Sequence, residues 1–190
     1  MSLYHQLTIL LVWAVWFIYW IARSGGTEKT GQRESSSSRR MHLILAGAAF
    51  ALIALPLSNV PPFGLKVLPS TKSLFVAGLA IMICGLAFAV WARRHLGQYW
   101  SGTITLKESH RLIRTGPYAI VRHPIYTGFV MGMVGTAVAQ GQVRAILAVV
   151  LLVASYLRKI KIEETWLVQQ FGDEYRTYQK EVGALIPCIK

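Results

Sequence analysis

The sequence predicts an all-α integral membrane protein, a bundle of about five transmembrane helices. Of its 190 residues, 54% are hydrophobic and only 15% are charged, whereas soluble domains have fewer apolar and more charged residues. The apolar residues are gathered into long runs. Since a helix of about 20 residues crosses a hydrocarbon core of about 30 Å, runs of this kind are candidate membrane spans.

Five apolar runs follow one another along the chain. The first is rich in Trp and Tyr and lacks a basic start, so it is expected to be a retained span and not a signal peptide. A polar, flexible loop is expected after it. The second ends at Pro56, the third is apolar throughout, and the last two are joined only by Gly141 and Gln142, which predicts a tight helical hairpin. The five runs are residues 3–21, 41–57, 73–91, 125–140 and 143–157.

We divide the chain into two regions on this basis. Residues 1–71 hold the first two helices and the polar loop between them. Residues 72–190 hold the other three helices, the polar segment between the third and fourth, and the C-terminal tail.

The Lys and Arg residues predict how these helices are oriented. If the first helix enters the cytoplasm, segments 22–40, 92–124 and 158–190 lie inside, and all but three of the 20 basic residues fall within them. Cytoplasmic segments of membrane proteins carry such an excess. The sequence therefore predicts a multi-pass protein with its N-terminus outside and its C-terminus in the cytoplasm.

The net charge of +12 follows from this bias and from attraction to anionic membrane lipids. A nucleic-acid partner is therefore not expected. Cys84 lies inside an apolar run and Cys188 in the inside tail, and neither has metal-ligand spacing. We expect neither a disulfide nor a bound metal.

Small residues recur four positions apart on the fourth apolar run. Gly128 and Gly132 form one pair, and Gly135 and Ala139 form a second. This spacing lets helix backbones approach closely. The third run offers a matching small-residue surface, expected to consist of Ala77, Gly78, Cys84, Gly85 and Ala89. The pattern favours tight packing of the two helices over a binding groove between them.

Polar and aromatic residues gather in the segment 92–124, which is too polar to span a membrane and too aromatic for a solvated linker. Pro124 is expected at the first position of the next helix, where its missing N–H costs nothing. His123 then lies beside the free N–H groups of a helix N-terminus, which favours anions. Taken singly, Arg122 could be a membrane anchor and the aromatic residues could lie at the interface. Together they predict a cytoplasmic pocket roofed by Trp100, Tyr118 and Tyr126.

A second polar stretch follows the fifth apolar run. Lys159 and Glu163 are four residues apart on a helix that continues out of this run, so they share a face and can form an ion pair. A solvated pair without a functional role is the alternative. The tail after Trp166 is amphipathic and is expected to fold back over the membrane face. A carboxylate beneath it could recognise a ribose diol or an amino group.

Four motifs keep a recognisable order and spacing. They are Leu96-Gly97-x-x-Trp100-Ser101, His110-x-Leu112-Ile113-x-x-Gly116-x-Tyr118, Arg122-His123-Pro124-x-Tyr126, and Glu163-Glu164 followed by Phe171-Gly172-x-Glu174-Tyr175-x-x-Tyr178. Over roughly residues 72–188 the chain resembles the isoprenylcysteine carboxyl methyltransferase family and its prokaryotic relatives. The Arg-His-Pro-x-Tyr motif alone is less specific, because phospholipid methyltransferases and some sterol reductases have similar runs.

The resemblance implies an integral membrane enzyme that takes S-adenosyl-L-methionine from the cytosol and a lipophilic acceptor from the bilayer. It implies catalytic roles for Arg122, Tyr126 and Glu163. It implies cofactor contacts at His110, Arg111, Leu112, Ile113, Tyr118, His123, Pro124, Ile125, Tyr126 and Glu163. For the acceptor it implies Lys159, with Arg158 and Trp100. The eukaryotic enzymes have an arginine where Lys159 stands, and lysine keeps the charge but loses the bidentate fork.

The expected reaction is in-line methyl transfer, most simply carboxyl O-methylation of a prenylcysteine-like acceptor. A carboxylate is already ionised, so the enzyme needs to supply only proximity, alignment and exclusion of water. One alternative is N-methylation of a phospholipid amine, although no residue stands out as the base. A sterol-reductase-like NADPH enzyme is a further alternative, but five spans and 190 residues are short for such an enzyme. A non-enzymatic membrane protein would place polar residues in the middle of its spans.

Overall fold

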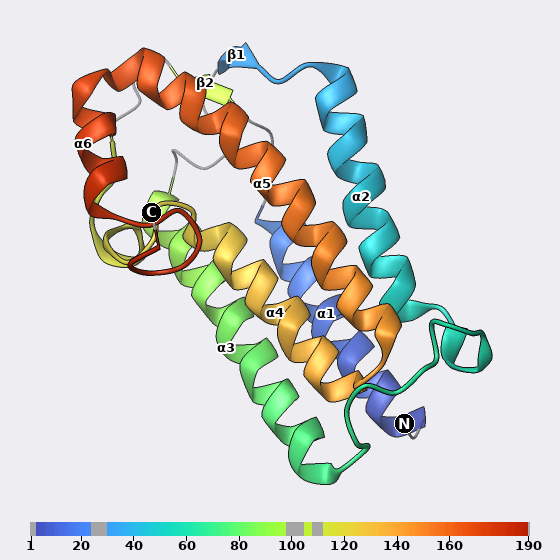
Figure 1. Ribbon diagram of the computed structural model, residues 1–190. Coiled ribbons are helices and arrows are strands. Elements are labelled where there is room, and N and C mark those ends of the chain that lie inside the picture. The colour runs from blue at the N-terminus through green and yellow to red at the C-terminus, as the bar shows by residue number, and fades with distance from the viewer. Residues whose placement is uncertain (1–2, 24–29, 98–104, 108–111, 190) are drawn as a thin grey trace.

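The computed structural model describes residues 3–23, 30–97, 105–107 and 112–189. These residues form a helical bundle with one small two-stranded ribbon (Figure 1). In chain order the elements are α1 (Leu3–Ala22), β1 (Thr30–Arg33), α2 (Ser36–Ala54), η1 (Leu57–Asn59), α3 (Lys72–Leu96), β2 (Thr105–Lys107), η3 (Gly116–Ala119), α4 (Pro124–Gln140), α5 (Val143–Phe171) and α6 (Asp173–Glu181).

Each of the five apolar runs forms a helix. Pro124 is the first residue of α4, as expected, and Gly141 ends it with a φ of 62°, a left-handed conformation that glycine adopts without steric cost. Two described helices, α1 and α3, are long and apolar enough by themselves to cross a membrane. The helical fold is thus confirmed, while the crossing of all five helices stays a prediction.

Two expectations about the loops were wrong. The polar loop ends earlier than expected, because Ser35 caps α2 by accepting a hydrogen bond from the Ser38 N–H at 3.2 Å. The loops also contain a short ribbon that was not expected, since β1 and β2 pair in antiparallel fashion. Their sequences, TGQR and TLK, are too short and polar to show the alternation that predicts a strand. The ribbon joins two segments that were expected on the same side of the membrane.

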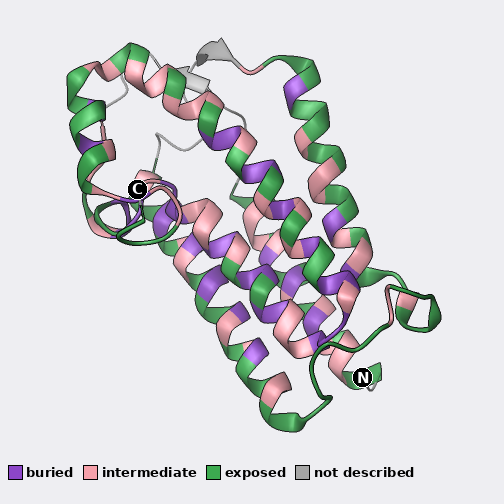
Figure 2. Ribbon diagram, in the orientation of Figure 1, coloured by how far each residue is buried: buried purple, intermediate pink, exposed green. Residues whose placement is uncertain are grey.

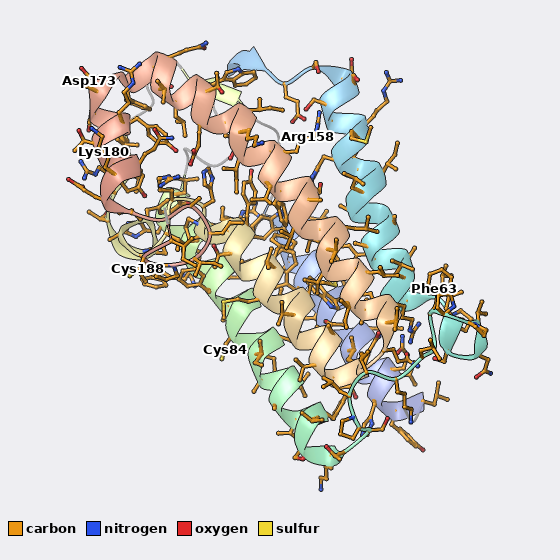
Figure 3. The ribbon with its side chains drawn as sticks, in the orientation of Figure 1. Phe63, Cys84, Arg158, Asp173, Lys180 and Cys188 are labelled. Atoms are coloured by element: carbon orange, nitrogen blue, oxygen red, sulfur yellow. The ribbon has the colours of Figure 1, made fainter. Side chains whose placement is uncertain are left out.

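Helices α3 and α4 pack closely through glycines. A Cβ atom on Gly135 would lie 2.4 Å from the Met82 nitrogen, and one on Gly128 would lie 2.4 Å from the Gly85 oxygen. This confirms tight packing of the two helices. The surface of α3 differs from the expectation at two positions, Ala77 and Cys84, because both are exposed and Cys84 lies on the outer side of the helix (Figure 3).

Gly135→Ala is expected to destabilise the protein by about 1–3 kcal/mol, the usual cost of overpacking, because the backbone of α3 would have to move. Gly47→Ala is the matched control on α2, since a Cβ there meets no atom within 4 Å. An alanine at position 47 should be neutral or stabilising, because glycine weakens a helix interior. Thermal unfolding in detergent measures both variants. Equal effects at the two positions would contradict the packing argument.

Aromatic side chains of α1 fill the interior of the bundle. The Trp13 indole N–H donates to the Thr136 hydroxyl at 3.1 Å, and the Trp16 indole N–H donates to the Leu86 carbonyl at 3.3 Å. Both indoles therefore bury their rings without leaving a polar atom unpaired. Figure 2 shows the buried residues concentrated where α1, α3, α4 and α5 come together.

The second half of α5 leaves this core and carries the site. In Figure 1 it extends beyond the last turns of α3 and the first turns of α4, at the end of the bundle where β1, β2 and α6 lie. At Gly172, with a φ of 54°, the chain reverses into α6. The residues after α6 consequently return to the beginning of α4.

Candidate active site

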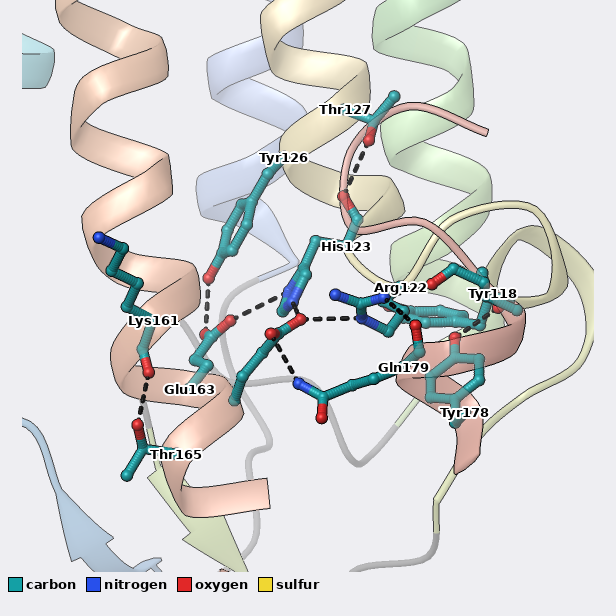
Figure 4. Close-up of polar contacts among 12 residues, drawn as sticks. Tyr118, Arg122, His123, Tyr126, Thr127, Lys161, Glu163, Thr165, Tyr178 and Gln179 are labelled. Atoms are coloured by element: carbon teal, nitrogen blue, oxygen red, sulfur yellow. Dashed lines mark hydrogen bonds and ion pairs between the residues drawn. The ribbon is translucent and has the colours of Figure 1, made fainter. Parts of the chain in front are cut away.

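A buried histidine stands between two carboxylates where α4 begins (Figure 4). The Nε2 atom of His123 lies 3.1 Å from Glu164 Oε1, and its Nδ1 atom lies 3.4 Å from Glu163 Oε2. The histidine precedes α4, and both glutamates belong to α5. The structure thus brings together the two polar stretches that the sequence analysis singled out.

Glu163 is also held by Tyr126 of α4. The phenol donates to Glu163 Oε1 at 2.6 Å. The Tyr126 ring stacks on His123, with centroids 5.6 Å apart and an interplanar angle of 5°. Because ionised carboxylates have about four lone-pair sites, Glu163 keeps the capacity to accept further hydrogen bonds. Its side chain is 22% exposed, so a ligand can reach it.

Glu164 is bound more completely than Glu163. Arg122 Nε donates to its Oε1 atom at 2.8 Å, and the Gln179 amide donates to its Oε2 atom at 2.9 Å. The Arg122 guanidinium also donates to the carbonyls of Gln179 and Val182 at the end of α6. Arg122 therefore ties α5 and α6 together beside the site.

The segment after α6 covers the start of α4 (Figure 4). The backbone N–H of Arg122 donates to the Gly183 carbonyl at 2.8 Å, and that of His123 donates to the Ala184 carbonyl at 3.0 Å. The Tyr178 hydroxyl of α6 donates to the carbonyl of Tyr118. The tail folds back onto the start of α4, and these contacts fix the backbone that leads up to His123.

The contacts of His123 and both glutamates shift their pKa values toward the charged forms. Burial lowers the pKa of His123, but its hydrogen bonds to Glu163 and Glu164 outweigh this effect and raise the pKa above 6.5. Burial raises the pKa of Glu164, but the hydrogen bonds from His123 and Arg122 bring it down to about 2. At Glu163, burial again raises the pKa, but the hydrogen bond with His123 outweighs this effect, so the pKa of Glu163 is lowered. The two carboxylates thus favour the imidazolium form of the histidine between them.

The contribution of this network to the stability of the protein is expected to be greatest between pH 4.5 and 6.5. Glu164, with its lowered pKa, contributes fully above 4.5, its ordinary value, and loses this contribution as the pH falls toward 2. His123, with its raised pKa, contributes fully below 6.5 and loses this contribution as the pH rises through its folded value. Unfolding temperatures on both sides of this window measure the effect. In the Glu164→Gln variant, the part of the fall in unfolding temperature below pH 4.5 that Glu164 causes should disappear. An unchanged fall would contradict its assignment to Glu164.

Lys159 is buried beside this network without an ion-pair partner among the described residues. It is 7% exposed, and its Nζ atom lies 5.4 Å from the centroid of the Tyr126 ring. The expected ion pair with Glu163 is absent, because Glu163 turns to Tyr126 and His123 instead. Arg158 lies apart from the site, where it donates to the Ser38 carbonyl of α2 at 3.0 Å (Figure 3).

The remaining expected site residues fall into three groups. Pro124 is buried directly after His123, Tyr118 is buried where its carbonyl accepts from Tyr178, and Ile125 is half-buried against the core. Leu112 and Ile113 are half-buried in the segment before η3. Trp100, His110 and Arg111 lie outside the described residues. The sequence analysis assigned no role to Glu164 or Gln179. Glu164 could have been found, because it belongs to the Glu163-Glu164 motif, whereas no local pattern indicates Gln179.

The site offers groups that attract a cationic ligand with hydroxyl groups. Among the described residues there is no group of three or more His, Cys, Asp or Glu side chains that could hold a metal. Glu163 offers a carboxylate with free lone pairs, and Tyr126 and Tyr156 stack with centroids 4.6 Å apart beside it. Carboxylates and aromatic faces are the groups that attract a cation. These residues fit S-adenosyl-L-methionine, which carries an ammonium, a sulfonium and a ribose diol.

The helical fold and the apolar helices α1 and α3 define a membrane protein whose polar site lies at one end of the bundle. Residues 73–174, more than half of the chain, match the phospholipid methyltransferase family. The chain belongs to this family, and the matched segment includes Arg122, His123, Glu163 and Glu164.

Curated relatives resemble the same part of the chain. The protein-S-isoprenylcysteine O-methyltransferase of Schizosaccharomyces pombe is 38% identical over 96 residues, which cover 49% of this chain and 41% of that protein. The enzyme of the same name from Saccharomyces cerevisiae is 32% identical over 123 residues, covering 63% of this chain and 52% of that protein. The chain thus aligns with about half the length of these relatives.

A solved structure shares the fold. The eukaryotic intramembrane Ras methyltransferase, an isoprenylcysteine carboxyl methyltransferase, superposes with a TM-score of 0.55 at 24% identity. The match covers 82% of this chain and 54% of that chain. It extends the similarity beyond the family segment, to the helical architecture of most of this protein.

Proposed function

We propose that this protein transfers a methyl group from S-adenosyl-L-methionine to a lipophilic acceptor in the membrane, and that the reaction is carboxyl O-methylation of a prenylcysteine-like substrate. The observation that carries the proposal is the contact of Glu163 with His123 and Tyr126, because it fixes an accessible carboxylate inside an aromatic site. The names of the relatives support the choice of acceptor.

The residues have separate tasks in this proposal. Glu163 accepts hydrogen bonds from the ribose or ammonium of the methyl donor, while Tyr126 and His123 hold Glu163 in place. When bound, S-adenosyl-L-methionine supplies an electrophilic methyl group on a sulfonium. Lys159 attracts an anionic acceptor. Since a carboxylate has no proton to lose, the site needs to align the reactants and exclude water, effects that are worth about 7–11 kcal/mol in well-oriented reactions.

We also propose that five helices cross the membrane, with the N-terminus outside and the site in the cytoplasm. The arrangement in Figure 1 supports this orientation, because β1, β2 and α6 lie at one end while the N-terminus and the α4–α5 hairpin lie at the other. The basic residues concentrate in the segments at the first end. The soluble methyl donor and the membrane-borne acceptor would then meet at the cytoplasmic surface.

N-methylation of a phospholipid amine is the second candidate, and the description of the family favours it. The buried ammonium of Lys159 opposes it, because a cation beside the site repels a protonated amine. An amine would also have to lose a proton, and both carboxylates of the site are already engaged by His123.

The test is to supply purified protein and methyl-labelled S-adenosyl-L-methionine with either a farnesylated cysteine or phosphatidylethanolamine. We expect label in the farnesylated cysteine as a base-labile methyl ester. Label in phosphatidylethanolamine alone would establish the second candidate. No label in either, together with no binding of S-adenosylhomocysteine, would overturn the proposal.

A further inference from the structure

Three polar side chains follow one face of α5 at intervals of four residues. They are Ser155, which is fully buried, Lys159, which is nearly so, and Glu163. Since an α-helix rises 1.5 Å per residue, this stripe is about 12 Å long. It leads from the proposed methyl-donor end of the site, at Glu163, toward the interior of the bundle.

A column of aromatic rings accompanies the stripe. The Tyr126 ring stacks on His123 and also on Tyr156, at centroid distances of 5.6 and 4.6 Å. The Tyr156 ring in turn lies 5.7 Å from the ring of His42 on α2. The site is therefore continuous with α2, a helix outside the segment that matches the family.

His42 meets the stripe at its inner end. Its Nδ1 atom lies 2.7 Å from the Ser155 hydroxyl. No described residue makes a hydrogen bond with its other nitrogen, Nε2. Polar groups in an apolar helix interface are costly unless they bind something, and they often mark functional sites. One nitrogen of His42 therefore has a structural partner, and the other is free to bind a ligand.

Lys159 lies one turn from Ser155 on the same face. Its ammonium is buried and has no carboxylate within ion-pair distance among the described residues. A buried cation without an anion is unfavourable, so an anionic ligand group would be bound strongly there.

We infer that His42 of α2 contacts the methyl acceptor, and that the anionic headgroup of a carboxylate-bearing lipid binds between His42 Nε2 and Lys159. The inference rests on the proposed function and adds a residue from α2 to its acceptor end. The Ser155 hydroxyl holds Nδ1 and thereby orients the imidazole, while Nε2 forms the hydrogen bond to the acceptor.

Two amide variants separate the two nitrogens. Asparagine places its amide near Nδ1, so His42→Asn can keep the contact with Ser155 and loses the group at Nε2. Glutamine places its amide near Nε2, so His42→Gln keeps a polar group at that position and loses the contact with Ser155. Leu43→Ala is the matched control, because Leu43 is the next residue of α2 and is 58% exposed.

We expect His42→Asn to raise the KM for the farnesylated cysteine by about 10- to 100-fold, the range for a hydrogen bond to a charged group. His42→Gln should raise it less, and Leu43→Ala should leave it unchanged. The affinity for S-adenosylhomocysteine should stay the same in all three, since His42 lies at the other end of the stripe from Glu163. Calorimetry and initial rates measure the two quantities, and unfolding temperatures confirm that each variant folds.

The opposite ranking would overturn the inference. If His42→Asn retains the wild-type KM while His42→Gln loses stability, His42 serves only to join α2 to α5. An unchanged KM in both variants would exclude contact with the acceptor. A wild-type protein that fails to bind S-adenosylhomocysteine would instead overturn the proposed function itself, and with it this inference.

Discussion

The Glu163→Gln variant is expected to bind S-adenosylhomocysteine at least tenfold more weakly than the wild type, and Glu163→Ala about 100-fold more weakly. Glutamine can still accept the Tyr126 hydrogen bond but has lost the charge that attracts an ammonium or strengthens a bond to a ribose hydroxyl. Hydrogen bonds to charged groups are worth about 1.5–3 kcal/mol, and each 1.4 kcal/mol is about a factor of ten in affinity. Isothermal calorimetry with detergent-solubilised protein measures this change directly.

Glu174→Gln is the control for this loss of charge. Glu174 lies on the exposed side of α6, and neutralising it changes the net charge in the same way without touching the site. Its affinity should equal that of the wild type. Full affinity in the Glu163 variants and in His123→Ala would remove the basis for placing the methyl donor here.

Arg122→Ala is expected to lower the free energy of unfolding by about 3–5 kcal/mol, the usual effect of removing one partner of a buried ion pair. The Arg122 and Glu164 side chains are 7% and 16% exposed. Without the guanidinium, Glu164 keeps a largely buried charge, and the last carbonyls of α6 lose their donor. Chemical or thermal unfolding in detergent measures the change.

Arg114→Ala provides the comparison. Arg114 also pairs with a glutamate of the C-terminal region, Glu181, but this pair is much more exposed. Exposed ion pairs contribute about 0–1 kcal/mol. If both variants lose a similar free energy of unfolding, burial of the Arg122–Glu164 ion pair is not the cause of the effect.

The helices were predictable from the sequence because their boundaries depend on local chemistry. Pro124 fixes the start of α4, and Gly141 permits the left-handed turn between α4 and α5. The ribbon of β1 and β2 was not predictable, because it depends on the pairing of two short polar segments that are far apart in the chain. Hydropathy likewise identifies apolar helices but does not decide how many of them cross a bilayer.

The candidate site was predictable where a motif carries its residues. Arg122, His123 and Glu163 belong to such motifs, and the structure brings them together. The four-residue spacing of Lys159 and Glu163 allowed an ion pair, but Tyr126 and His123, from another part of the chain, offered Glu163 better partners. Gln179 reaches Glu164 only because α6 turns back at Gly172. His42 lies on a helix that has no motif.

The contacts of Arg122 and His123 with residues 179–184 have a consequence during protein synthesis. A ribosome adds residues in order, so Arg122 emerges long before the carbonyls of Val182, Gly183 and Ala184 exist. Until then, the buried guanidinium and two backbone N–H groups lack their acceptors. The polar centre can therefore close only after residue 184 has left the exit tunnel.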